Sequence, residues 1–209
     1  MKAFKMTVAA VALTVSGAAM AGPGWTYVEA GYNIGDNDLG NLGPWDEFPN
    51  GSYKDNTKGY NLGGSLGFAN IWHAKLNYWK GDYYIKELER KGYNVVLGIH
   101  PAVTDSTDLV FEINYTKLDY RFDGDSEKFK DSGGGLETGL RSMLSDTVEG
   151  NATISLQKTD FKNYEVAANL GGAWNFATNW AITARATIGE SETNFNAGIR
   201  WYLGQYNKL

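Results

Sequence analysis

The first candidates for chemistry are isolated charged side chains that lie at alternate positions between apolar residues. Eight of them lie in rows that are otherwise small and polar: Glu29, Lys75, Glu112, Glu137, Arg141, Glu165, Arg185 and Arg200. Unpaired charges are costly inside a protein, so acids and bases enclosed together are expected to pair. The pattern therefore predicts a charge network that fills an interior, and the alternative is a row of charges lining a pore.

The two histidines, His73 and His100, are the candidates for general-base catalysis. Both histidines lie beside short predicted turns. Short turns are expected on the periplasmic side of such a sheet, whereas an enzyme of the cell surface would need its catalytic residues at the opposite, external end. We therefore expect lumen or interface histidines, and no enzyme. The acidic stretches at 36–41 and 123–127 lack the spacing of a calcium loop. Without a Ser-His-Asp order, a phosphate loop or a metal-ligand cluster in the sequence, no metal or other cofactor is expected.

The elements that would position these residues are clearest between Tyr164 and Ile188. Apolar residues occupy every second position up to Phe176, and the same rhythm resumes after a short break. A period of two with a short connection predicts an antiparallel hairpin. Each apolar row is about as long as a membrane-crossing strand of about 9–11 residues. Trp174, Phe176 and Trp180 gather at the turn, as in the aromatic girdle of a membrane interface, and the opposite face has the small and polar composition of a lumen.

The same alternation recurs along the whole chain. It predicts an all-β fold, a transmembrane up-and-down antiparallel β-barrel of about ten strands, with eight as the alternative. The predicted strands cover residues 25–32, 59–68, 72–78, 93–99, 109–115, 136–144, 150–156, 164–176, 180–188 and 195–203. Long loops are predicted at 34–57, 82–91 and 122–132, and short turns near Asn70, Thr104, Asp146 and Thr178. Short periplasmic turns and long external loops are the usual asymmetry of such barrels.

The beginning of the chain predicts export. Lys2 and Lys5 precede an apolar run from Met6 to Ser16, and Ala19-Met20-Ala21 is a small-x-small cleavage pattern. Residues 1–21 are therefore expected to be a signal peptide and residues 22–209 the barrel domain, located in the cell outer membrane of a Gram-negative bacterium. A membrane anchor or buried helix is the alternative for the first segment. Without residues 1–21, which hold two lysines and no acid, the charge changes from −5 to −7.

Composition narrows the function classes. The chain has no cysteine, a net charge of −5 and a mean hydropathy of −0.38. A disulfide scaffold is thereby excluded, and the acidic balance argues against nucleic acid as a partner. The alternative fold is a secreted soluble barrel or sandwich, whose outer face would need many charged residues. The polar rows consist mostly of Gly, Asn, Ser, Thr and Ala, which suit a crowded interior better than a surface in water.

Three short segments carry a resemblance to a known family: Tyr27–Tyr32, Pro101–Leu109 and Glu137–Ser142. With the order of segments around them, they resemble the small bacterial outer-membrane β-barrel family of the OmpA-like barrel superfamily, over nearly all of the mature chain. The resemblance implies fold and location and no catalytic residues. Such barrels usually end on an aromatic residue, whereas Trp201 and Tyr202 are followed here by a tail to Leu209.

The expected role is structural or one of surface interaction, such as adhesion or ligand binding by the external loops. Trp45, Phe48 and Tyr53 are possible binding anchors in the first loop. The expected partners are outer-membrane lipid and lipopolysaccharide, the barrel-assembly machinery during insertion, and an extracellular ligand or host surface. A narrow porin-like pore for small solutes is the alternative, and an outer-membrane enzyme ranks last.

Overall fold

The computed structural model describes residues 24–38, 54–83, 88–122, 128–160 and 164–203. Regular structure in these ranges is entirely β. Among the same residues, no helix is long and apolar enough to cross a membrane.

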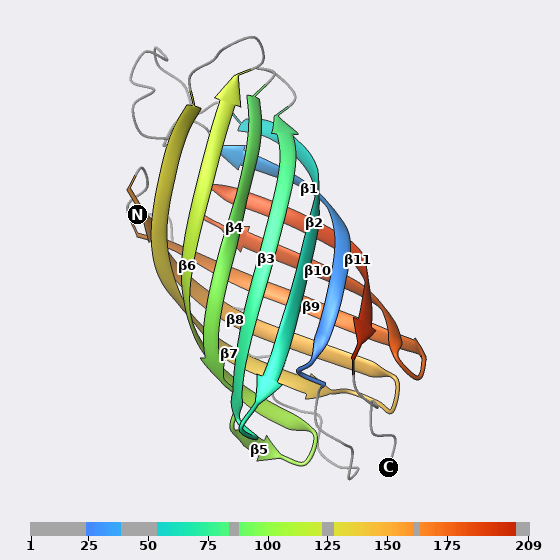
Figure 1. Ribbon diagram of the computed structural model, residues 1–209. Coiled ribbons are helices and arrows are strands. Elements are labelled where there is room, and N and C mark those ends of the chain that lie inside the picture. Colours follow the sequence, from blue (N-terminus) through green and yellow to red (C-terminus); the bar gives the residue numbers. More distant parts are fainter. Residues whose placement is uncertain (1–23, 39–53, 84–87, 123–127, 161–163, 204–209) are drawn as a thin grey trace.

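Ten long strands close into an antiparallel barrel (Figure 1). Each strand pairs with its neighbour in sequence, and β1 closes the ring by pairing with β11. The short β5 lies beside β6 at one end, so that β4 pairs directly with β6. The strands are β1 (Tyr27–Asp38), β2 (Lys54–Phe68), β3 (Trp72–Tyr83), β4 (Leu88–Ile99), β5 (Ala102–Thr104), β6 (Thr107–Phe122), β7 (Lys128–Met143), β8 (Val148–Thr159), β9 (Glu165–Ala177), β10 (Trp180–Gly189) and β11 (Glu192–Tyr202). The predicted fold class and strand number are confirmed.

The apolar row of each strand faces outward. On β10, Ile182 is 48% exposed and its neighbour Thr183 only 4% exposed. Large apolar side chains are exposed in the same way around the barrel, including Leu62 on β2 and Ile113 on β6. An outward apolar face and a polar lumen are the arrangement of a transmembrane barrel, in which closure pairs the backbone groups that lipid cannot satisfy.

An aromatic group marks one rim of the outer surface. Trp180 on β10 stacks on Trp201 of β11 with ring centroids 5.9 Å apart, and on β9 the ring of Trp174 lies 6.3 Å from that of Phe176. All four side chains are between 42% and 54% exposed. The predicted cluster at the hairpin turn is therefore on the outside of the barrel, where an interfacial girdle belongs.

The strands run further than predicted at the end opposite these aromatics. Residues 34–38, 54–57, 88–91 and 128–132 are paired in strands, so the predicted loops at 34–57, 82–91 and 122–132 were too long. Apolar alternation marks only the part of a strand that contacts lipid, whereas the hydrogen-bonded ladder continues beyond it with polar residues. Glu89, for example, lies in the predicted loop 82–91 but belongs to β4 and forms an ion pair with Lys80 of β3.

The two ends of the barrel differ in the length of their connections. The turn end carries the short connections at 69–71, 144–147 and 178–179, together with β5, which the sequence did not predict. At the other end, the loop end, lie the strand ends that flank the segments 39–53, 84–87, 123–127 and 161–163. These segments lie outside the described residues, as do the expected signal peptide and the tail after Leu203. Trp25, predicted to begin the first strand, precedes β1 and is turned inward, with 8% of its surface exposed.

Candidate functional site

The lumen has two parts, a plug of buried side chains at the turn end and a polar cavity beyond it. We call the first the turn-end plug. It comprises Trp25, Tyr27, Glu29, His73, Lys75, His100, Asp108, Glu112, Arg141, Glu149, Arg200 and Tyr202. The cavity has a volume of about 420 Å³.

Trp25 is the centre of the plug. Its ring stacks on both imidazoles, with ring centroids 4.3 Å from His73 and 4.2 Å from His100, and the two imidazoles lie 5.4 Å from each other. Its Nε1 donates a hydrogen bond of 2.7 Å to Asp108 Oδ2. The guanidinium of Arg141 lies 4.4 Å from the ring centroid, within the range of a cation–π contact. A single aromatic ring is thus held by an aromatic, a carboxylate and a cationic contact.

These contacts extend across the lumen. Trp25 precedes β1, whereas Asp108 is on β6 and Arg141 on β7, which are four and five strands away around the ten-stranded ring. Arg141 Nη2 also donates to the carbonyl oxygen of Gly24 at 2.7 Å. The segment before β1 is therefore fixed to the opposite wall and covers the interior at the turn end.

A second layer of the plug is an arginine–glutamate network. Glu149 accepts two hydrogen bonds of 2.8 Å from Arg141, one on each carboxylate oxygen, and a third of 3.1 Å from Arg200. Arg200 also binds Glu29 at 2.8 Å, directly across the β1–β11 pair. Glu149 is 1% exposed and Arg200 is 3% exposed. Two acids and two bases are thus enclosed with their charges balanced, which buried ions require.

The third group lies on β3 and β6. Glu112 Oε1 lies 2.5 Å from Lys75 Nζ and 2.9 Å from His73 Nε2. Glu112 is 6% exposed and His73 has no exposed surface. The same histidine thus bridges the carboxylate and the Trp25 stack. Both histidines therefore belong to the interior at the turn end, as the sequence indicated.

The eight predicted charges do not all meet one another. Glu29 pairs with Arg200 and Lys75 with Glu112, while Arg141 and Arg200 meet through Glu149. Glu137 instead accepts a hydrogen bond of 2.5 Å from Thr153, and Glu165 accepts two from Ser191. Arg185 forms no ion pair within 4 Å and no hydrogen bond with the rest of the described chain, although it faces the cavity. Sequence reasoning missed Glu149, yet it is in phase with the polar row of β8 and could have been found there.

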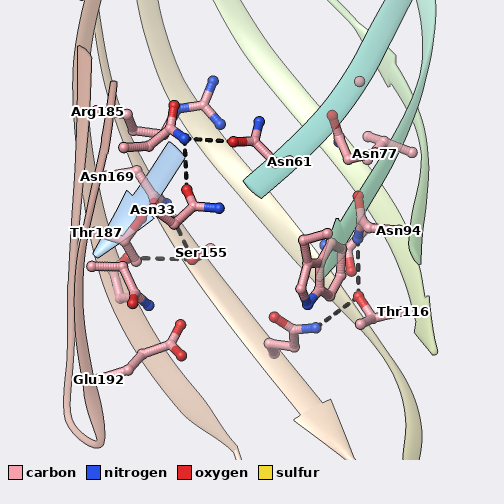
Figure 2. Close-up of a pocket in the computed structure, with 18 of the residues that line it drawn as sticks. Asn33, Asn61, Asn77, Asn94, Thr116, Ser155, Asn169, Arg185, Thr187 and Glu192 are labelled. Carbon is pink, nitrogen blue, oxygen red and sulfur yellow. Dashed lines mark hydrogen bonds between the residues drawn. The ribbon is translucent and has the colours of Figure 1, made fainter. Parts of the chain in front are cut away.

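Amide and hydroxyl groups are the most frequent polar groups on the cavity wall (Figure 2). Asn196 Nδ2 lies 2.6 Å from the Oδ1 atoms of both Asn33 and Asn61. On the facing wall, Asn94 Nδ2 donates to Thr116 Oγ1 at 2.9 Å. The asparagines that line it are Asn33, Asn61, Asn77, Asn94, Asn114, Asn151, Asn169, Asn194 and Asn196. Amides both donate and accept hydrogen bonds, so this wall suits polar uncharged groups.

The described part of the chain contains no set of side chains that could bind a metal ion. No group of three or more His, Cys, Asp or Glu side chains there is close enough to hold one. Of the acidic stretch at 36–41, residues 36–38 are the end of β1 and the rest lies outside the described residues, as do the stretch at 123–127 and Trp45, Phe48 and Tyr53.

No family model matches the sequence, and no curated protein matches it either. Several solved structures are similar. The β-domain of the Bordetella autotransporter BrkA is 14% identical with a TM-score of 0.50, and the match covers 86% of this chain and 99% of that one. The attachment invasion locus protein Ail of Yersinia pestis is 17% identical with a TM-score of 0.43, covering 85% and 99%. The KdgM porin is 11% identical with a TM-score of 0.45, covering 84% and 99%.

The fold is that of a bacterial outer-membrane β-barrel. At this level of identity the match to BrkA shows the fold alone, and it agrees with the closed strand order. The fold alone does not determine the function of the lumen and the loops, which depends on the residues of this chain.

Proposed function

We propose that this protein is an integral outer-membrane β-barrel whose lumen is sealed at the turn end, and that its role is structural or one of surface interaction at the loop end. The observation that carries the proposal is the turn-end plug. Trp25 is fixed to β6 and β7 across the interior, and the Arg141–Glu149–Arg200 network lies beside it. A permanent channel would require these buried contacts to be absent.

The outer surface supports the membrane location. Exposed apolar side chains surround the barrel, and aromatics mark the rim at the turn end. Lipid and the acyl chains of lipopolysaccharide are the partners that such a surface fits, and the barrel-assembly machinery would act during insertion. With the turn end in the periplasm, the loops at 39–53, 84–87 and 123–127 would face the outside, where an extracellular ligand or host surface could bind.

A narrow pore for small solutes is the second candidate, and the cavity of about 420 Å³ is the observation in its favour. Barrels of about eight strands are filled by side chains, and open channels appear at about sixteen. Ten strands leave a space in the middle, but that space is a conduction path only if the turn-end plug opens.

Planar-bilayer recordings separate the two candidates. We expect the purified wild-type protein to show no steady conductance. Trp25→Ala combined with Glu149→Ala should give openings, because it removes the ring and the shared carboxylate from the seal. Trp180→Ala is the matched control, since that tryptophan is 44% exposed on the outer surface. Steady channels in the wild type that change with Arg185→Gln or Glu137→Gln would favour transport and contradict the sealed barrel.

The surface role has its own test. Residues 39–53 would be replaced by a short Gly-Ser linker between the paired residues Asp38 and Lys54, and binding of the purified protein to host cells compared with that of the intact chain. Loss of binding with retained heat-modifiable gel mobility is the expected result. Binding that survives the replacement would mean that the first loop is not the contact surface.

A further inference from the structure

We propose that the amide-lined cavity is a binding site for a neutral saccharide of one or two rings. The proposal rests on the sealed barrel described above, since a lumen closed at the turn end can retain a ligand rather than conduct it. The proposal names the class of ligand that the barrel would bind and the part of the lumen that would bind it.

Pairs of asparagine and glycine build the cavity wall. Five asparagines that line it lie directly across a strand pair from an inward glycine: Asn61 and Gly31, Asn77 and Gly63, Asn114 and Gly135, Asn151 and Gly171, and Asn194 and Gly35. A Cβ atom on each glycine would lie only 2.0 to 3.0 Å from the facing amide. The missing side chains therefore leave room for the amides against the wall.

This arrangement keeps the interior hollow. At Gly63, an added Cβ would approach Asn77 Oδ1 to 2.3 Å, and at Gly171 it would approach Asn151 Oδ1 to 2.6 Å. Larger residues at these glycines would push both amides toward the middle of the lumen. The turn-end plug shows how the same barrel fills its interior when it is closed, with arginine, tryptophan and histidine rather than with glycine and asparagine. The difference between the filled turn end and the hollow middle of the lumen indicates that the cavity is a binding site.

Several groups on the wall are available to a ligand. Arg185 has no ion-pair or hydrogen-bond partner among the described residues, and the side-chain amides of Asn77 and Asn151 bind no other described group. Asn114 Oδ1 is buried and has no hydrogen-bond partner in the same part of the chain. Sugar hydroxyls both donate and accept, so they can satisfy amide and guanidinium groups together. These groups come from β3, β6, β8 and β10, and so surround the space.

Charge and size indicate the ligand class. Six basic and six acidic side chains line the cavity, so it has no net charge to attract an ion. Its volume of about 420 Å³ is within the range of about 300–1,000 Å³ that is usual for small-molecule pockets. Trp25 and Trp79 also line it and can contribute apolar ring surface to the carbon face of a sugar.

Polar groups lie on opposite sides of the cavity. Arg185 is on β10 and Asn94 on β4, five strands apart in the ring of ten, which places them on opposite sides of the barrel. Figure 2 shows Arg185, Asn169 and Thr187 on one side of the space, with Asn94 and Thr116 on the other. A ligand between them would be held from both sides.

The test is a titration of the refolded full chain in detergent micelles with glucose, galactose, maltose and lactose, followed by calorimetry and saturation-transfer NMR. Saturable binding of at least one of these sugars is expected. Arg185→Met and Asn151→Leu should each weaken that binding about tenfold, because each removes hydrogen bonds to the ligand. Ile154→Leu, on the outward face next to Thr153, is the matched control and should leave binding unchanged.

Three results would overturn the proposal: no saturation by any sugar of the panel, affinity that survives both cavity variants, or tighter binding of glucuronate or inorganic phosphate than of the neutral sugars. Heat-modifiable gel mobility of each variant separates lost binding from lost folding. An absence of sugar binding in a barrel that also shows no conductance leaves the sealed barrel standing. Steady wild-type conductance would instead contradict the proposed function itself.

Discussion

Glu149→Gln removes the carboxylate shared by two buried arginines. In the wild type, Glu149 is 1% exposed and accepts two hydrogen bonds from Arg141, one from Arg200 and one from Tyr202. Arg200 keeps Glu29 as its partner, but Arg141 loses its bidentate carboxylate and is left with neutral acceptors, such as the Gly24 carbonyl, and aromatic faces close to it. Removing one partner of a buried ion pair costs about 3–5 kcal/mol, because the remaining charge stays enclosed without compensation.

The assay is equilibrium unfolding of the refolded barrel in urea, in detergent micelles, followed by gel mobility and tryptophan fluorescence. Glu137→Gln is the matched control. That carboxylate also faces the lumen, but among the described residues it accepts a hydrogen bond from Thr153 alone, so the variant should lose about 1 kcal/mol. If both variants lower the free energy of unfolding equally, or if Glu149→Gln is silent, the plug is not held by its arginine–glutamate network.

Three further changes test the wall and its rim. Ile182→Arg should lower the free energy of unfolding from lipid vesicles by about 2–4 kcal/mol if this exposed residue lies near the bilayer midplane. An unchanged free energy would refute the outward orientation of Ile182. Gly139→Ala brings a Cβ to 2.1 Å from the backbone carbonyl oxygen of Ala152 on the neighbouring strand and should cost about 1–3 kcal/mol, more than the outward Gly64→Ala. Equal melting temperatures of the two variants would contradict the close strand contact at Gly139. Glu89→Gln, at an ion pair open to solvent, should change the free energy of unfolding by less than about 1 kcal/mol, and a larger loss would show that this rim is buried.

Alternation along single strands predicted which residues face outward and which face the lumen. Ile182 and Thr183 show this on one strand, and Glu112 and Ile113 on another. A period of two is a local property of the backbone, so it needs no knowledge of the neighbouring strands. The eight inward charges were found in the same way.

Partners inside the lumen could not be predicted, because they depend on the register and the tilt of strands that are far apart in sequence. Glu149 on β8 reaches Arg200 on β11, and Trp25 reaches Asp108 on β6. Trp25 has the same phase as Tyr27 and Glu29, so alternation agrees with its inward side, but nothing local predicts its contacts across the lumen. The glycine–asparagine pairs of the cavity wall also depend on the register. Both residue types are frequent throughout the chain, and only the pairing of the strands places one opposite the other.

The orientation of the wall is tested most directly at two neighbouring residues of β8. Ile154 is 50% exposed, whereas Ser155 lines the cavity, and the natural chain has no cysteine to interfere with single-cysteine labelling. Ile154→Cys and Ser155→Cys would each carry an environment-sensitive fluorophore in vesicles that contain brominated lipid. The predicted result is strong quenching by the lipid at position 154 and little at position 155. Equal quenching at the two positions, or the reverse order, would contradict an apolar surface in lipid around a polar lumen.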